Sequence, residues 1–328
     1  MDDKAPYYQL SPDVVLDAVE ATGRSCDGRL LALNSYENRV YQVGIDDEQP
    51  VVAKFYRPGR WTDEAILEEH AFALEIAAHE IPLVAPLADD DVTLHRHAGF
   101  RFALFPRRGG RSAEPDDLDQ LNWIGRFIGR IHAVAATRPF AHRPRVDVES
   151  YVLFARTWLL ENNCIPGDLL PAWTTTLDAL LPRIDAAFQR AGDYREMRLH
   201  GDCHLGNILW THAGPHFVDL DDCRTGPAIQ DLWMLLSGDR RDMTLQLAEV
   251  LDGYEEFHDF NRRELHLVEA LRAMRMIHHS AWLAQRWEDP AFPAAFPWFG
   301  GQRYWEEQVL ALREQLALLD EPALDAQA

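Results

Sequence analysis

Hydrophobic and polar positions follow two periods in the first third of the chain, one typical of strands and one typical of helices. Residues 11–23 begin with Ser-Pro and end with Gly, which predicts a capped helix. Residues 62–79 have a Thr cap, early acids and apolar positions at helical spacing, and predict a second helix. Strands are expected at 40–43 and 51–56, joined as a hairpin, and at 99–106.

Helical spacing dominates the remainder of the chain. Apolar residues recur with a helical period in the segments 121–133, 151–161, 173–191, 228–237, 243–258 and 263–287. The sequence RRGGR, which follows the last N-terminal strand, interrupts both patterns and marks a predicted hinge. We therefore expect an α+β protein with an N-terminal domain over residues 1–106 and a helical C-terminal domain over residues 107–328.

The segment LHGDCHLGNILW places polar residues beside apolar runs inside this helical region. Two short β-type runs, 207–210 and 217–220, flank the sequence THAGPH and predict a hairpin. In such an antiparallel pair Asn207 would lie opposite Leu220 and within a few ångströms of Asp219. The sequence thus predicts that an amide and a carboxylate meet at one end of the hairpin.

An amide oxygen and a carboxylate at a strand end form a hard-oxygen site with few protein ligands. Such a site suits Mg²⁺, which retains water and accepts phosphate oxygens from a substrate. Asp202 lies five residues before Asn207 and would be near the metal without binding it. A loop carboxylate there can accept the proton of an attacking hydroxyl. This division of roles is the one that phosphoryl transfer requires.

Two other interpretations of the cluster remain open. His200, Cys203, His204 and Cys223 are close in sequence, although their spacing matches no structural zinc pattern. Alternatively, the Asp and Asn side chains serve only as caps of loops.

The pattern HGDxxxxN, followed by two apolar residues and an Asp at a strand end, resembles the motif of the aminoglycoside phosphotransferase and choline kinase superfamily, relatives of eukaryotic-like protein kinases. This resemblance implies a bilobal fold with a small β-rich N-terminal lobe that covers ATP. It implies that Asp202 is the catalytic base. It also implies that Asn207 and Asp219 hold Mg²⁺, with Asp219 part of the catalytic set, and that Lys54 of VVAKFY binds the phosphates.

Further positions follow from the same resemblance. Glu69, or its neighbour Glu68, would pair with Lys54, and Asp231 of GPAIQDLW would brace the catalytic loop. The chain has no GxGxxG loop, and LNSYENRV occupies that place. Ser35 would then lie over ATP, although the same residues could form a rigid turn.

The hinge and the C-terminal aromatic residues are two more candidate contacts. Leu104, Phe105, Pro106 and Arg107 occupy the place where backbone groups would pair with adenine, and we name Leu104, Phe105 and Arg107 as candidate cofactor-binding residues. The aromatic-rich segment 278–305 either lines the substrate or packs as helices capped by a Pro-rich turn.

Longer runs, among them LNSYENRVYQ, VVAKFYRP and FVDLDD, resemble one branch of bacterial cytoplasmic stress-related Ser/Thr protein kinases over about residues 10–320. The resemblance implies a Mg²⁺- and ATP-dependent kinase with protein substrates and self-phosphorylation. A small-molecule kinase of the same fold, acting on an aminoglycoside, choline, fructosamine or amino-alcohol, is the alternative. A third hypothesis, an ATP-binding protein without catalysis, is disfavoured by the intact set of Lys54, Asp202, Asn207 and Asp219.

Composition narrows the expected partners and location. Apolar residues make up 47% and charged residues 26%, an ordinary globular balance. The net charge of −21 repels nucleic acids and anionic membranes, so we expect neither as a partner. The chain shows no long apolar run, no signal peptide in MDDKAPYYQL and no CxxC pair among its four cysteines. These features predict a cytoplasmic protein, and the lack of exposed heptads predicts a monomer.

Overall fold

The computed structural model describes residues 6–325. Residues 1–5 and 326–328 lie outside the described residues. The first range is part of the N-terminal segment MDDKAPYYQL, from which we predicted that there is no signal peptide. The mixed α+β class expected from the sequence is confirmed.

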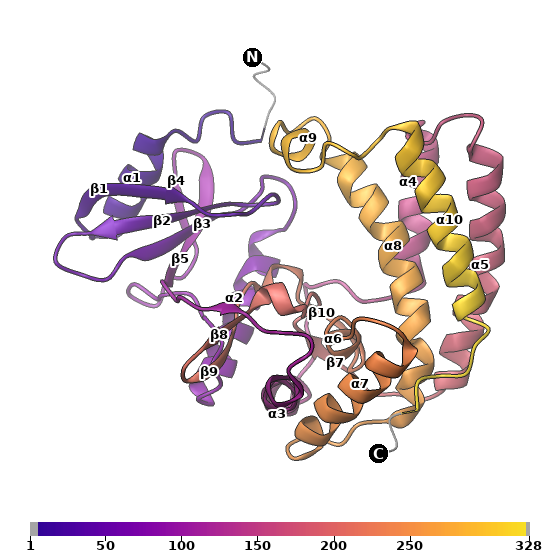
Figure 1. The fold of residues 1–328 in the computed structure, drawn as a ribbon. Helices are drawn as coiled ribbons and strands as arrows, with labels where there is room; N and C mark the ends of the chain where they lie inside the picture. Colours follow the sequence, from indigo (N-terminus) through magenta and orange to yellow (C-terminus); the bar gives the residue numbers. More distant parts are fainter. Residues whose placement is uncertain (1–5, 326–328) are drawn as a thin grey trace. The chain divides into compact units, whose positions relative to one another are not determined.

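The described chain forms two compact units, and Figure 1 labels most of their helices and strands. The first comprises residues 6–113, Phe140–Arg143 and Leu205–Cys223, and the second comprises all the rest. The predicted boundary after residue 106 had assigned residues 205–223 to the C-terminal domain. The compact units place them in the first unit, because their strands pair with strand β6 (Arg111–Ser112) and with residues 82–84 there.

The first unit is built on an antiparallel sheet with the strand order β1-β2-β3-β5-β4. The strands are β1 (Cys26–Ala32), β2 (Arg39–Ile45), β3 (Val51–Phe55), β4 (His95–His97) and β5 (Phe100–Pro106). The predicted hairpin of β2 and β3 and the predicted strand β5 are confirmed. β1 and β4 were not predicted, because their mixed composition lacks the alternation of a half-buried strand.

Two predicted helices accompany this sheet, and both have the predicted caps. Helix α1 (Pro12–Glu20) begins after Ser11, whose hydroxyl accepts a hydrogen bond from the Val14 amide at 3.3 Å. Helix α2 (Asp63–Ala78) begins after Thr62, which accepts one from a backbone amide of the first turn. Such caps each contribute on the order of 1 kcal/mol to helix stability.

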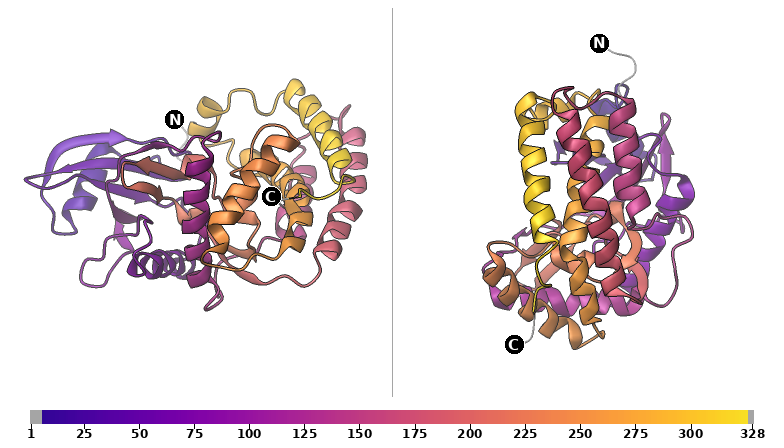
Figure 2. Two further views of the ribbon diagram at one scale, coloured as in Figure 1. Left: turned by 60° about the horizontal axis from the view of Figure 1, so that its bottom comes forward. Right: turned by 90° about the vertical axis from the view of Figure 1, so that its right-hand side faces the viewer.

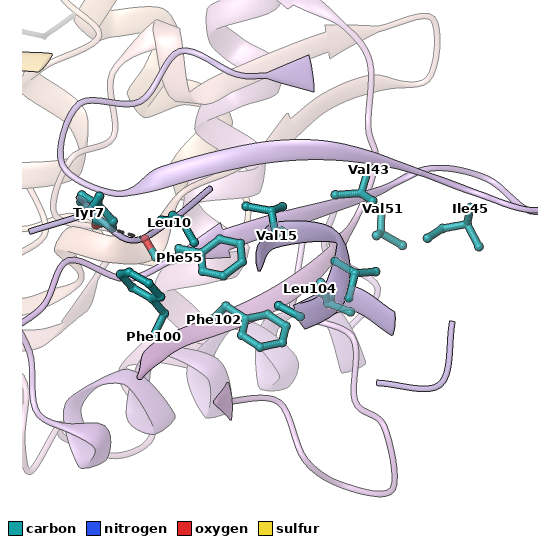
Figure 3. Packing of buried hydrophobic residues seen from close by; sticks show 13 residues of the cluster. Tyr7, Leu10, Val15, Val43, Ile45, Val51, Phe55, Phe100, Phe102 and Leu104 are labelled. Carbon is teal, nitrogen blue, oxygen red and sulfur yellow. Dashed lines mark hydrogen bonds between the residues drawn. The ribbon is translucent and has the colours of Figure 1, made fainter. Parts of the chain in front are cut away.

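The core of the first unit lies between α1 and the sheet (Figure 3). Phe55 stacks on Phe102 with ring centroids 5.2 Å apart, and Val15 of α1 is fully buried in the same cluster. The hydroxyl of Tyr7 donates to the carbonyl of Phe55 at 3.2 Å. Each fully buried side chain of this size contributes about 1.5–3 kcal/mol, so the cluster fixes β3 against its neighbours.

The hairpin near the polar cluster exists, but its predicted register is wrong. β8 (Ile208–Thr211) pairs with β9 (Gly214–Phe217) across a two-residue turn, so GPHF supplies the second strand. The carbonyl of Asn207 accepts a hydrogen bond from the amide of Val218 at 3.0 Å. Asn207 therefore lies beside Val218 and not opposite Leu220, which begins a 3₁₀ turn. The short strand β6 pairs with the outer edge of β8.

The second unit is mostly helical, as predicted, and the helices α4, α5, α8 and α10 pack side by side (Figure 2). It also contains a strand pair that was not predicted, β7 with β10. Its elements are α3 (Leu118–Ala135), α4 (Phe154–Glu161), α5 (Leu170–Ala191), β7 (Glu196–Leu199), β10 (Arg224–Pro227), α6 (Gln230–Trp233), α7 (Arg240–Glu255), α8 (Val268–Gln285), α9 (Ala291–Ala295) and α10 (Gln302–Leu318).

Helices α3 and α7 approach each other closely through glycine. A Cβ atom on Gly125 would lie 2.0 Å from the carbonyl oxygen of Val250, and one on Gly129 would lie 2.4 Å from that of Tyr254. Only glycine permits this separation of the two backbones. The contact fixes α3, which carries His132, whose Nε2 lies 3.1 Å from Oδ2 of Asp231.

The C-terminal aromatic residues contact one another between α8, α9 and α10. Trp282 meets Phe292 edge-on with centroids 5.1 Å apart, and Trp287 lies 4.9 Å from Phe299. These contacts match the packing alternative from the sequence. Within residues 6–325 no helix has the length and hydropathy needed to cross a membrane.

Candidate active site

Lys54 is the centre of a charged cluster in the first unit. It lies on β3 opposite Ala103 of β5, and its side chain is only 7% exposed. Its Nζ lies 3.3 Å from Glu69 Oε1, 3.0 Å from Asp219 Oδ1 and 3.2 Å from Asp221 Oδ1. Three acidic residues from two distant segments of the sequence thus converge on one buried ammonium group.

The two adjacent glutamates of α2 have different partners. Glu69 is on the buried face of the helix and contacts Lys54. Glu68 accepts hydrogen bonds from the backbone amides of residues 141–143, at 2.6–2.9 Å. Of the two candidates named from the sequence, Glu69 is therefore the one that contacts the lysine.

The charges of the cluster support one another. Burial opposes the charged form of Lys54, but the carboxylates of Asp219, Asp221 and Glu69 outweigh it and raise the pKa of Lys54 well above its usual value. Burial acts in the same sense on Asp221, yet Arg60 and Lys54 hold its pKa below the usual value. Burial raises the pKa of Glu69. Of the two buried carboxylates that contact Lys54, Asp221 therefore has the stronger tendency to stay ionised.

Sequence reasoning missed Asp221 and the two arginines that hold it. Arg60 contacts Asp221 through Nη1 and Asp222 through Nη2, the latter at 2.7 Å. Arg143 donates from Nε to the carbonyl of Cys223 at 2.9 Å and from Nη2 to the carbonyl of Asp221. Asp221 is the second acid in DLDD, so the sequence next to Asp219 could have suggested it as a further site residue. The sequence around the two arginines does not indicate their acidic partner.

Asp219 follows β9 in an unusual backbone conformation, with φ 63° and ψ 72°. A non-glycine residue in this region carries strain, which recurs at functional sites. Its side chain is 52% exposed, although one oxygen contacts Lys54. The hydrogen bond between Val218 and Asn207 brings the backbone of Asn207 next to the residue that precedes Asp219. The pairing of the Asn207 and Asp219 side chains around a metal stays a prediction.

The candidate nucleotide-binding residues of the hinge and of the loop lie outside the charged cluster around Lys54. Leu104 lies in the hydrophobic core, and its carbonyl accepts a hydrogen bond from the Leu87 amide at 2.7 Å. Phe105 is half-buried on the opposite face of β5, and Arg107 is exposed just beyond the strand. Ser35 is half-buried in the turn between β1 and β2. A role for these residues in nucleotide binding stays a prediction.

The HGD segment belongs to the second unit, where Asp231 of α6 braces it. Asp231 is 1% exposed and accepts hydrogen bonds from the amides of His200 at 2.7 Å and Gly201 at 2.8 Å. Its Oδ2 also lies 3.1 Å from His132 Nε2. Gln230 adds a bond from Nε2 to the Gly201 carbonyl at 3.1 Å. Three hydrogen bonds therefore fix the backbone just before Asp202, and the contact with His132 holds Asp231 itself.

Asp202 contacts two basic side chains of its own unit. Its Oδ1 lies 2.8 Å from Nη1 of Arg275 in α8, and its Oδ2 lies 3.5 Å from Nε2 of His204. Arg275 was not predicted as a partner of Asp202, because the two residues are distant in sequence. Asp202 and Asn207, five residues apart in the chain, belong to different compact units.

Metal binding through several His, Cys, Asp or Glu residues is not apparent in the described part of the chain. Residues 6–325 contain no group of three or more His, Cys, Asp or Glu side chains that could hold a metal ion. The zinc alternative therefore finds no ligand group there. A Mg²⁺ site on Asn207 and Asp219 would need only two protein ligands.

Comparison with known proteins shows which family and which proteins this chain is similar to. Residues 29–268 match the phosphotransferase enzyme family. Stress response kinase A of Escherichia coli (strain K12) is 46% identical over 318 residues, which cover 97% of this chain and 96% of that protein. Serine/threonine protein kinase RdoA of Salmonella typhimurium is 46% identical over 325 residues, which cover 99% and 98% respectively.

Solved structures of small-molecule kinases share the fold. The amicoumacin kinase hAmiN, in complex with AMP-PNP, Ca²⁺ and Ami, superimposes with a TM-score of 0.71 at 17% identity over 95% of each chain. The microcompartment-associated aminopropanol kinase does so with a TM-score of 0.67 at 19% identity, over 94% of this chain and 97% of that one.

Proposed function

Because the chain belongs to the phosphotransferase enzyme family and its relatives are kinases, we propose that it uses Mg²⁺ and ATP to phosphorylate serine or threonine residues of proteins. The observation that carries this proposal is the meeting of Lys54, Glu69 and Asp219. The choice of a protein substrate is supported by the name of the Salmonella relative, which is 46% identical over nearly the whole chain.

Lys54 would bind the phosphate oxygens of ATP. Its raised pKa keeps the ammonium group charged at physiological pH, and Glu69 and Asp221 hold it in place from the buried side. Phosphoryl transfer is catalysed mainly by positioning and by stabilising charge, so a fixed cation is the chemistry that this step needs.

Asn207 and Asp219 are the proposed Mg²⁺ ligands. One supplies an amide oxygen and the other a half-exposed carboxylate, and such a donor set suits a hard cation that retains water. When bound, Mg²⁺ would neutralise charge on the phosphates. The left-handed conformation of Asp219 fixes the point at which its carboxylate leaves the backbone.

Asp202 is the proposed base. The acceptor hydroxyl oxygen forms a bond to the γ-phosphorus, the bond from that phosphorus to the bridging oxygen of ADP breaks, and the hydroxyl proton passes to Asp202. Asp231 holds the preceding backbone, while Arg275 and His204 orient the carboxylate.

A small-molecule kinase is the second candidate. The solved structures with this fold include an amicoumacin kinase and an aminopropanol kinase, and fold alone does not determine the substrate. The identity of those chains is below 20%, whereas the relatives named as stress response kinases or as a Ser/Thr kinase are 46% identical. This difference favours the protein substrate.

Transfer of label from γ-labelled ATP tests the proposal. We expect phosphoserine or phosphothreonine on a generic protein substrate or on the enzyme itself in the presence of Mg²⁺. Asp202→Asn should lower the rate by 10²-fold or more, in line with the loss of a general base, while nucleotide binding is retained. Asp178→Asn is the matched control, because this residue forms an exposed pair with Arg156 on the same unit.

Two outcomes would contradict the proposal. Equal labelling by Asp202→Asn and by the wild-type enzyme would refute the role of Asp202. ATP consumption only with small alcohols, and no label on any protein, would assign the enzyme to the second candidate.

A further inference from the structure

A cavity of about 370 Å³ lies in the second unit next to the catalytic loop. Its walls come from the catalytic loop, α6, the turn into α7 and one face of α8. The lining residues used below are His204 of the loop, Trp233 of α6, and Arg272 and Arg275 of α8. The mechanism proposed above uses two of these residues only as neighbours of Asp202.

The wall of this cavity is basic, which is unexpected in this chain. The chain carries 53 acidic and 32 basic residues, yet the lining contains two arginines, a histidine and no carboxylate. The carboxylates that pair with the arginines belong to residues outside the lining. Arg272 Nη1 lies 3.2 Å from Glu269 Oε2, and Arg275 Nη1 lies 2.8 Å from Asp202 Oδ1.

Two of the lining residues connect the cavity to Asp202. Arg275 and His204 both line the cavity and both contact the carboxylate of Asp202, at 2.8 Å and 3.5 Å. A guanidinium group has five N–H donors in a planar fork, so Arg275 can bind Asp202 and a second anion at the same time. A group bound in the cavity is therefore adjacent to the proposed base.

Arg272 is held in position against the cavity wall. Its guanidinium carbon lies 5.6 Å from the centre of the Trp233 ring, and its Nη2 lies 3.4 Å from the sulfur of Met243. Together with the pair to Glu269, these contacts limit the conformations of the side chain. An arginine that is ordered before binding loses little entropy when it binds a carboxylate or phosphate.

We propose that this cavity is an anion subsite for the phosphoryl acceptor, and that the enzyme selects acceptor segments with an acidic side chain close to the serine or threonine. The inference rests on the proposed function and specifies its substrate class. Carboxylate and phosphate share the chemistry that two guanidinium groups recognise, so aspartate, glutamate and a phosphorylated residue are all suitable. The same wall disfavours the cationic amino-alcohols and aminoglycosides of the alternative, because two guanidinium groups would repel their ammonium groups.

The first test compares three peptides of equal length that present one serine among glutamates, alanines or lysines. We expect the KM of the glutamate peptide to be at least tenfold below that of the lysine peptide. A fourth peptide, with phosphoserine in place of one glutamate, separates a carboxylate from a phosphate as the bound group. Equal KM values for the three peptides, with label transferred to all, would overturn the subsite and leave the kinase function intact.

Substitution of Arg272 assigns the preference to the cavity. Arg272→Gln should raise the KM of the glutamate peptide about tenfold and change that of the alanine peptide much less, and Arg272→Glu should reverse the order of the glutamate and lysine peptides. Arg303→Gln and Arg303→Glu change the net charge equally at a side chain of α10 that is 89% exposed, and should leave the order as in the wild type. An equal effect of the Arg303 and Arg272 variants would overturn the assignment.

The wild-type enzyme supplies a test that does not depend on folding of a variant. Inorganic phosphate should inhibit competitively against the glutamate peptide at saturating ATP, and inhibition competitive only with ATP would contradict the subsite. If no peptide is phosphorylated, ATP consumption is measured with hydroxy acids and with amino-alcohols. A preference for hydroxy acids retains the subsite and rejects the protein substrate, whereas a preference for amino-alcohols rejects both.

Discussion

At the scale of single residues, Asp221 shows how the cluster depends on charge balance. It is 4% exposed and contacts both Lys54 and Arg60. An isolated buried cation is costly, and removal of one partner from a buried pair typically destabilises a protein by about 3–5 kcal/mol. The contacts of Asp221 therefore predict that it maintains the fold of the first unit and the position of Lys54 at once.

We expect Asp221→Asn to reduce the free energy of unfolding by about 3 kcal/mol, because the side chain keeps its shape but leaves Lys54 and Arg60 undercompensated. The KM for ATP should rise several-fold as well. Urea unfolding and steady-state kinetics measure the two effects. Asp13→Asn, at an exposed position in the first turn of α1, is the control and should change neither beyond a few tenths of a kcal/mol. If Asp221→Asn were as stable as the wild type, the neighbouring acidic residues alone would be enough to compensate the charges of Lys54 and Arg60.

The sequence predicted part of this site because some of its residues belong to a motif of fixed order. Lys54, Asp202 and Asp219 are each embedded in short runs with a recognisable composition. The partners of Arg60 and Arg275 were not predicted, since each arginine acquires its partner only through folding of distant segments. Long-range ion pairs leave no periodicity in the chain, and a single sequence cannot reveal them.

At the scale of elements, the short helix α6 links the HGD segment to the helical body of the second unit. Asp231 of α6 holds the loop backbone, and Glu264, in the 3₁₀ turn before α8, accepts a hydrogen bond from the amide of Ile229 at 3.0 Å. The sequence predicted a ten-residue helix over 228–237, but its regular part has only four residues. Side-chain contacts, and not helix length, hold this element.

Glu264 predicts a pH dependence of stability. Burial raises its pKa to about 7 from 4.5, against the opposing effect of the backbone amides of Ile229 and Ala228. The folded state therefore binds this proton more tightly than the unfolded state. The contribution to stability is fully present below about pH 4.5 and is lost as the pH rises through about 7. At about 1.4 kcal/mol for each unit of pKa change, the total is at most about 3.5 kcal/mol.

Glu264→Gln keeps an oxygen for the amide of Ile229 and removes the titration. We expect the variant to gain stability relative to the wild type between pH 5 and pH 8, by up to about 3 kcal/mol. Urea unfolding at a series of pH values measures the difference. Glu314→Gln, at an exposed position of α10, serves as the control. A difference between variant and wild type that stays constant over this range would refute the assignment to Glu264.

At the scale of the whole molecule, the chain passes between its two compact units several times. Residues 140–143 and 205–223 belong to the first unit, although helical segments of the second unit surround them in sequence. The change of composition in the sequence indicates one domain boundary near residue 106. It cannot reveal that later segments of the chain rejoin the first unit. The returning segment carries Asn207 and Asp219, so the site depends on contacts that no contiguous domain contains.

The fragment 107–328 tests this organisation. It retains β8 and β9 but lacks residues 82–84, whose backbone exchanges hydrogen bonds of 2.8 and 2.9 Å with Phe217, a fully buried residue. It also lacks α2, so Arg143 loses its contact with Glu69.

We expect peptides from 205–223 to exchange amide hydrogen rapidly in the fragment and slowly in the full-length protein, because exchange follows the local free energy of opening. Peptides from α5 and α10 should stay protected in both, since these helices pack within the second unit. Equal protection of 205–223 in both proteins would mean that the returning segment folds with the C-terminal part alone, as the single sequence-based boundary implies.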